Sequence, residues 1–312
     1  MTMNTKQKKI VSISGTLLIA VSLIFIVNRF RSVEIDFNIL TTPRVLFGLI
    51  ALIFLHSFYF ILTAINYHAW VFNASGKRMS LPAVLTVYCS ANLFKYIPGG
   101  ILTLAGRNRL AVDFDELIHG EVAAATTFEA IFFGVSTVVI SFLFAFEYAI
   151  AEIRRVAFLP LIIITEVAVL TAAIIILYSL RNRFKKLLSL FNMFNALKPV
   201  VIIKRMGAAL FFSVVWGMVF MLILLIMGQP MSLGFALTII GLFNLAWLAG
   251  LLVPIAPAGL GVREAAIIMF MGGMVFEEYL LLAIMGHRIV VITGDIFAYL
   301  FALFMARMKN TF

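Results

Sequence analysis

A Pro-Gly-Gly triplet, Pro98-Gly99-Gly100, interrupts the apolar stretch 81–104, and it constrains the fold more than any other feature. Proline removes a backbone hydrogen-bond donor, and glycine exposes the backbone around it. In the hydrocarbon of a membrane, such a break is tolerated only where protein or a water-filled cavity satisfies the freed backbone groups. The triplet therefore predicts a broken helix beside a protected polar site, provided that the stretch lies in a membrane.

Composition places the chain in a membrane. Of its 312 residues, 63% are hydrophobic and 12% are charged, and the mean hydropathy is +1.12. Soluble domains carry about a quarter charged residues. The sequence predicts an all-α polytopic membrane protein with one domain over residues 1–312, whose halves cover about 10–150 and 156–307. This length leaves no room for an additional soluble catalytic domain of ordinary size.

A second break of the same kind lies in the second half. It carries two prolines and two glycines, namely Pro254, Pro257, Gly259 and Gly261. Pro98 precedes Arg107 by nine residues, and Pro254 precedes Arg263 by nine residues. Broken apolar segments at corresponding positions of two halves are typical of secondary transporters. We therefore interpret each break as the tip of a re-entrant hairpin.

Six other apolar runs are long enough to cross a membrane as helices. They are residues 10–27, 45–71, 121–146, 158–178, 206–227 and 279–305. Together with hairpins at 81–104 and 232–276, they predict about six full transmembrane helices and two broken hairpins. Three full crossings then separate the two breaks, so the halves form an inverted repeat. The alternative is that one or both broken segments cross fully, which gives seven or eight crossings.

The distribution of positive charge favours the hairpin topology. It places sixteen of the 24 Lys and Arg on the side that holds both termini, and six on the other side. By the positive-inside rule, both termini are predicted to be cytoplasmic, in a cell inner membrane. The net charge of +10 indicates attraction to anionic lipid head groups. We expect no nucleic-acid partner, because the basic residues lie between apolar spans.

Charged side chains at membrane depth are costly, so each is a candidate for function. The predicted head-group site consists of Asn92, Lys95, Arg107, Glu129, Arg263, Glu264, Arg288 and Asp295. Arginine can donate two parallel hydrogen bonds to a phosphate, and helix N-termini after Gly100 and Gly261 would add donors. We expect a hydrated basic cavity between the hairpin tips, with the acids balancing the arginines or relaying protons. The alternative is that Glu129, Arg288 and Asp295 form structural ion pairs between helices.

Other kinds of chemistry find no support in the sequence. Cys89 is the single cysteine, and His56 is predicted to be an interhelix hydrogen-bond partner or an interface anchor rather than a metal ligand. Gly259-x-Gly261 lacks the preceding strand and third glycine of a dinucleotide site. The chain has neither a P-loop nor a nucleophile elbow. We expect no metal, no cofactor, no catalytic residue and no enzymatic activity.

At the two breaks, the sequence resembles the lysylphosphatidylglycerol synthase transmembrane-region family, also called the flippase-like domain family. The first half carries Asn92, Pro98-Gly99-Gly100 and Arg107. The second carries Pro254-x-x-Pro257-x-Gly259-Leu-Gly261-Val-x-Glu264, followed by Arg288. The resemblance covers about residues 10–307. Glu129-Ala130 departs from the family pattern, in which an arginine accompanies the acidic residue.

This resemblance implies a membrane domain that handles lipids. In the multiple peptide resistance factor, such a domain flips aminoacylated phosphatidylglycerol that an attached synthase domain makes. Because no acyltransferase-like domain precedes Phe312, we expect no synthesis of lysyl-lipid. The expected function is an inner-membrane lipid translocase for aminoacyl-phosphatidylglycerol-like lipids or polyprenyl-phosphate-linked sugars. Two alternatives remain, namely a non-transporting scaffold that docks a glycosyltransferase or another lipid-modifying enzyme through its basic loop 181–205, and a transporter of ions or small solutes.

Overall fold

The computed structural model describes residues 24–33, 35–96, 102–115, 117–153, 197–251 and 257–309. Throughout these ranges the regular structure is helical, and they contain no strand. The predicted all-α fold class is therefore confirmed.

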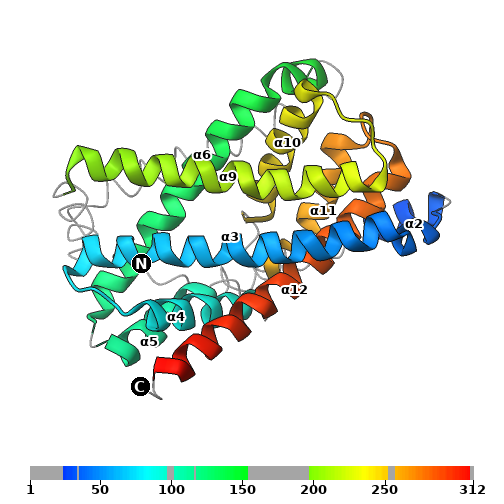
Figure 1. Ribbon diagram of the computed structural model, residues 1–312. Helices are drawn as coiled ribbons and strands as arrows, with labels where there is room; N and C mark the ends of the chain where they lie inside the picture. Colours follow the sequence, from blue (N-terminus) through cyan, green and yellow to red (C-terminus); the bar gives the residue numbers. More distant parts are fainter. Residues whose placement is uncertain are drawn as a thin grey trace, which may run out of the picture.

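Four long helices match four of the predicted crossings (Figure 1). They are α3 (Pro43–Ser75), α6 (His119–Ile153), α9 (Pro199–Met227) and α12 (Glu277–Lys309). The shortest has 29 residues, which at about 1.5 Å of rise per residue exceeds the hydrocarbon thickness of a bilayer. Both α3 and α9 begin with proline at the first helical position, where its missing N–H is harmless. Each is followed directly by a glycine, Gly76 after α3 and Gly228 after α9. Both glycines adopt the left-handed conformation that glycine allows.

Interhelical hydrogen bonds fix the directions of the long helices. Arg44 near the start of α3 donates to the carbonyl of Leu225 near the end of α9, at 3.2 Å. Asn66 in the second half of α3 accepts from Arg205 near the start of α9, at 2.6 Å. The two helices are therefore antiparallel. We call the two ends of the bundle the Pro43 end and the Ser75 end.

The first predicted hairpin enters from the Ser75 end. Its descending arm is α4 (Leu81–Leu93), which continues into the short 3-10 helix η1 (Phe94–Tyr96). The returning arm, α5 (Leu102–Asp115), packs against α4. It extends past the predicted limit at Leu104, so Arg107 and Arg109 lie inside it. A helix can hold these charges because Arg107 turns into the protein, whereas Arg109 is exposed.

The second hairpin enters from the Pro43 end. Helix α10 (Leu233–Leu251) leads to the 3-10 helix η2 (Pro257–Gly259), and α11 (Val262–Met271) packs back against α10. Gly250 and Gly259 permit the sharp tip, since a Cβ on Gly259 would lie 3.3 Å from the Cα of Gly250. Helices η1 and η2 contact each other, so the two hairpin tips meet inside the bundle.

Five described helices are long and apolar enough to cross a membrane, namely α3, α6, α9, α10 and α12. Most of the run 10–27 and all of the run 158–178 lie outside the described residues. The count of six full crossings and the inverted repeat therefore remain predictions.

Close packing of α9 on α10 at Gly217 gives a testable prediction. A Cβ at this position would lie 2.8 Å from the carbonyl oxygen of Ile240 and from the amide nitrogen of Asn244. We expect Gly217→Ala to lower the free energy of unfolding by about 1–3 kcal/mol, because the backbone carbonyl has no room to move. Gly207→Ala on the same helix is the control, since no described atom lies within 4 Å of its Cβ position. Thermal unfolding in detergent measures both, and equal midpoints would contradict the prediction.

Candidate functional site

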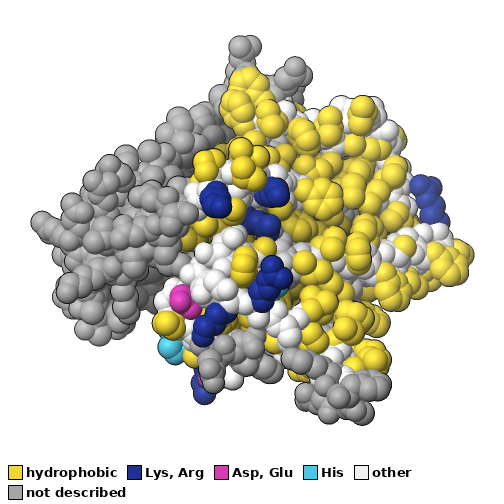
Figure 2. Space-filling model, turned by 60° about the vertical axis from the view of Figure 1, so that its left-hand side comes forward, with side chains coloured by type: hydrophobic (Ala, Val, Ile, Leu, Met, Phe, Trp, Pro, Cys, Tyr) yellow, Lys and Arg dark blue, Asp and Glu magenta, His cyan; other side chains and the backbone are white. Residues whose placement is uncertain are grey.

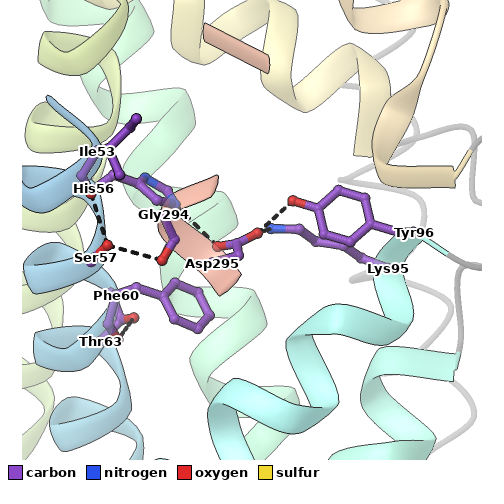
Figure 3. A network of polar contacts seen from close by, with 9 residues as sticks. All are labelled: Ile53, His56, Ser57, Phe60, Thr63, Lys95, Tyr96, Gly294 and Asp295. Atoms are coloured by element: carbon purple, nitrogen blue, oxygen red, sulfur yellow. Dashed lines mark hydrogen bonds and ion pairs between the residues drawn. The ribbon is translucent and has the colours of Figure 1, made fainter. Parts of the chain in front are cut away.

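Asp295 on α12 binds three donors from two other elements (Figure 3). Its carboxylate contacts His56 Nε2 on α3 at 3.1 Å, and Lys95 Nζ and Tyr96 Oη on η1 at 2.6 Å each. The Asp295 side chain is only 1% exposed. This carboxylate therefore ties the tip of the first hairpin to the packed pair α3 and α12.

The Asp295 cluster lies at mid-depth, because His56 and Asp295 are both near the middle of 33-residue helices. The helices approach closely here, since Ser57 donates to the carbonyl of Gly294 at 3.0 Å. A Cβ on Gly294 would lie 2.6 Å from the His56 ring. Glycine at this position thus lets His56 reach Asp295.

Two arginines share one carboxylate oxygen at the tip of the second hairpin. Glu264 Oε1 forms an ion pair with Arg288 on α12 and lies 3.6 Å from Arg263 Nη2. The other oxygen, Oε2, accepts the N–H of Gly261 at 2.7 Å and so caps the start of α11. Arg263 and Glu264 are buried, and Arg263 Nε has no hydrogen-bond partner among the described residues.

Two clusters meet here, namely the Asp295 cluster and the Glu264 cluster, which consists of Glu264, Arg263 and Arg288. Together they carry an excess positive charge. Lys95 and Asp295 balance each other, whereas Arg263 and Arg288 face the single carboxylate of Glu264. Arg288 precedes Asp295 by two turns of α12, and the tips that carry Lys95 and Arg263 meet through η1 and η2. A buried net charge is unfavourable unless it is compensated. The meeting point of the tips is therefore suited to one anionic group.

Arg107 forms a separate ion pair beside the Asp295 cluster, and the Phe60 and Tyr88 rings lie between it and Lys95. Its guanidinium binds Glu129 Oε2 on α6 at 2.5 Å and stacks over the Tyr88 ring, 4.0 Å from its centroid. Tyr88 also donates to Glu129 Oε1 at 3.1 Å. Arg107 thus supplies, from α5, the cation that is missing beside Glu129 in the sequence pattern. A structural ion pair between helices was the alternative that the sequence analysis gave for Glu129, and the Arg107–Glu129 pair has this form.

The structure brings together five predicted site residues at the tips, namely Lys95, Asp295, Arg263, Glu264 and Arg288. Asn92 is buried near the end of α4, two residues before η1 begins at Phe94. Pro257 and Gly259 form η2, and Gly261 precedes α11. Pro98, Gly99, Gly100 and Pro254 lie outside the described residues.

Sequence reasoning identified His56 correctly as an interhelix partner, but it missed Tyr96 and Tyr88. The position of Tyr96 next to Lys95 at a hairpin tip was the available signal, whereas Tyr88 in an apolar run gave none. The described residues contain no group of three or more His, Cys, Asp or Glu side chains arranged to hold a metal ion.

No curated protein matches the chain. Residues 12–295 match the protein family described as "Lysylphosphatidylglycerol synthase TM region", a range that includes both hairpins and every charged residue of the two clusters. The chain therefore belongs to the lysylphosphatidylglycerol synthase transmembrane-region family.

Proposed function

We propose that this multi-pass membrane protein binds the phosphate-bearing head group of a lipid and translocates that lipid across a cell inner membrane. The observation that carries the proposal is the pair Arg263 and Arg288, which shares the single carboxylate of Glu264 where the two tips meet. Candidate cargoes are aminoacyl-phosphatidylglycerol-like lipids and polyprenyl-phosphate-linked sugars. The protein acts as a transporter, without an enzymatic step of its own.

The chemistry of the tips supports binding of a phosphodiester. A guanidinium offers a planar fork of donors that fits two phosphate oxygens. Arg288 and Lys95 have side chains that are 18% and 23% exposed, so a head group can reach them. The positive end of the α11 helix dipole begins at Val262, beside Arg263. One phosphodiester charge would compensate the excess positive charge of the clusters.

Charge at the ends of the bundle supports an orientation. Exposed basic side chains gather at the Ser75 end (Figure 2), and they include Lys77, Arg78, Arg109, Lys198, Lys204 and Arg307. Positive residues are enriched in cytoplasmic segments of membrane proteins. In our proposal the Ser75 end faces the cytoplasm. Most of the basic loop 181–205 lies outside the described residues, so its role as a docking segment remains a prediction.

Lipid flipping in vesicles tests the function. The purified chain is reconstituted in phosphatidylcholine vesicles that contain a small fraction of fluorescent phosphatidylglycerol, and a membrane-impermeant quencher measures exchange between leaflets. We expect Arg263→Ala and Arg288→Ala each to reduce flipping at least about tenfold, the loss expected for a charged hydrogen bond to the ligand. Both variants should fold, because each leaves one arginine paired with Glu264.

Arg109→Ala is the matched control for these variants. It removes an exposed arginine, 86% accessible, whose ion pair among the described residues is with Asp113 on the same helix. The control is expected to flip lipid at the wild-type rate. Wild-type flipping by both Arg263→Ala and Arg288→Ala would refute the proposed site.

A further inference from the structure

His56 has a buried ring nitrogen without a hydrogen-bond partner. An ionised carboxylate only accepts hydrogen bonds, so His56 Nε2 must donate its N–H to Asp295. In a neutral imidazole, Nδ1 is then an acceptor. Nδ1 is buried and has no hydrogen-bond partner among the described residues, and the residue is 1% exposed. The side chain can therefore take up one proton without breaking its bond to Asp295.

Two more unpartnered polar atoms lie in the same aromatic cluster. The Trp216 ring on α9 lies between the His56 ring, at 5.6 Å, and the His287 ring, at 5.5 Å, measured between centroids. Trp216 Nε1 and His287 Nε2 are also buried without a hydrogen-bond partner among the described residues. Buried polar atoms are satisfied by ordered water when protein groups do not reach them. His56 Nδ1 is thus one of three buried ring nitrogens in this aromatic cluster that lack a hydrogen-bond partner among the described residues.

From this geometry we propose that His56 Nδ1 binds a proton that is coupled to lipid binding. The coupling rests on the proposed lipid-binding function, whereas the proton site itself does not. Lys95 now neutralises Asp295, as Figure 3 shows. When His56 gains a proton at Nδ1, the imidazolium neutralises Asp295 in place of Lys95. The Lys95 ammonium is then free to bind the phosphate of a head group.

The charges balance in this step. One proton enters at His56 and one phosphodiester anion binds at Lys95, so these two added charges offset each other. A phosphodiester that binds without the proton compensates the excess positive charge of Arg263 and Arg288 instead. The proton strengthens binding because it frees the Lys95 ammonium for the head group. Binding free energies are reciprocal, so a proton that favours lipid binding is itself bound more tightly when lipid is present. A proton gradient could then drive translocation in a chain without a P-loop.

His56 is suited to this role because its imidazole is bonded to Asp295. The charged and titratable groups around it are as follows. Asp295 and His287 on α12 and Tyr59 on α3 interact with His56 itself. Lys95 and Tyr96 on η1 and Cys89 on α4 interact with the Asp295 carboxylate that His56 contacts. Farther away, Glu129 on α6 is neutralised by Arg107, and Arg263 and Arg288 share Glu264. Helix α9 contributes aromatic rings here. Imidazole is the side chain that ordinarily changes charge between about pH 5 and pH 8.

Trp216 reports the protonation directly, because a protonated imidazole quenches indole fluorescence. The signal is the difference in emission between the full-length wild type and Trp216→Phe, titrated from about pH 8 to pH 5. We expect the emission of Trp216 to fall on acidification, and this transition to disappear in His56→Gln. Glutamine keeps a donor toward Asp295, so an unchanged melting midpoint at pH 8 shows that the variant folds. His287→Gln is the matched control and should retain the transition.

Lipid binding then tests the coupling, with short-chain phosphatidylglycerol as the probe. The wild type should bind it about tenfold more tightly at pH 5 than at pH 8, and His56→Gln should bind equally at both. A transition that survives in His56→Gln, or an unchanged pH dependence of binding in that variant, would overturn the proposal. A fluorescence transition without any binding of the probe would refute the lipid function and the coupling, while the proton site would stand.

Discussion

Asp295→Ala is expected to lower the free energy of unfolding by about 3–5 kcal/mol, because it leaves the Lys95 ammonium in the protein interior without a counter-ion. The substitution also removes the acceptor of His56 and of Tyr96. These donors come from α3 and η1, so the first hairpin would lose its attachment to the α3 and α12 pair. The change should appear as a lower melting midpoint in detergent and as faster proteolysis at η1.

The double variant Asp295→Ala/Lys95→Ala is the control for this prediction. It removes both charges, and it should recover most of the lost stability, because a missing ion pair is less harmful than an unpaired charge. A double-mutant cycle with Lys95→Ala measures the coupling between the two side chains. If the single and double variants unfold at the same midpoint, Lys95 reaches water and the ion pair contributes little.

The long helices could be predicted from the sequence because hydropathy and length determine them directly. The four described long helices start and end within seven residues of the predicted runs. The hairpin breaks followed from Pro98 and Pro254, and the meeting of the tips followed from transporter analogy. The extent of α5 could not be predicted in this way. A charged residue such as Arg107 ends an apolar run in the sequence, even where its side chain is buried in an ion pair.

Pairing of the charged residues is the part that sequence reasoning left open. Seven charged candidates could combine in many ways, and spacing along one helix says nothing about partners on another. Glu129 paired with Arg107 and Asp295 with Lys95 only because α4 and α5 return beside α6 and α12. The excess positive charge at the tips emerges only once these pairs are known. It is a property of the packing rather than of the composition.

That excess charge leads to the second large effect, which is expected in Glu264→Gln. The glutamine carbonyl can still accept the N–H of Gly261, so the cap of α11 is kept, but Arg263 and Arg288 lose their shared counter-ion. We expect the free energy of unfolding to fall by about 3–5 kcal/mol in a neutral detergent. Added phosphatidylglycerol should recover most of this loss, because an anion that binds only the folded state stabilises it.

The stabilisation by anionic lipid should therefore be larger in Glu264→Gln than in the wild type, and phosphatidylcholine should have little effect on either. Asp113→Asn is the matched control, since it removes a negative charge from an exposed residue on α5. A weaker response of Glu264→Gln to phosphatidylglycerol would contradict the prediction. It would mean that the carboxylate itself contacts the cargo, as it would if it bound the amino group of an aminoacylated head group while the arginines bound the phosphate.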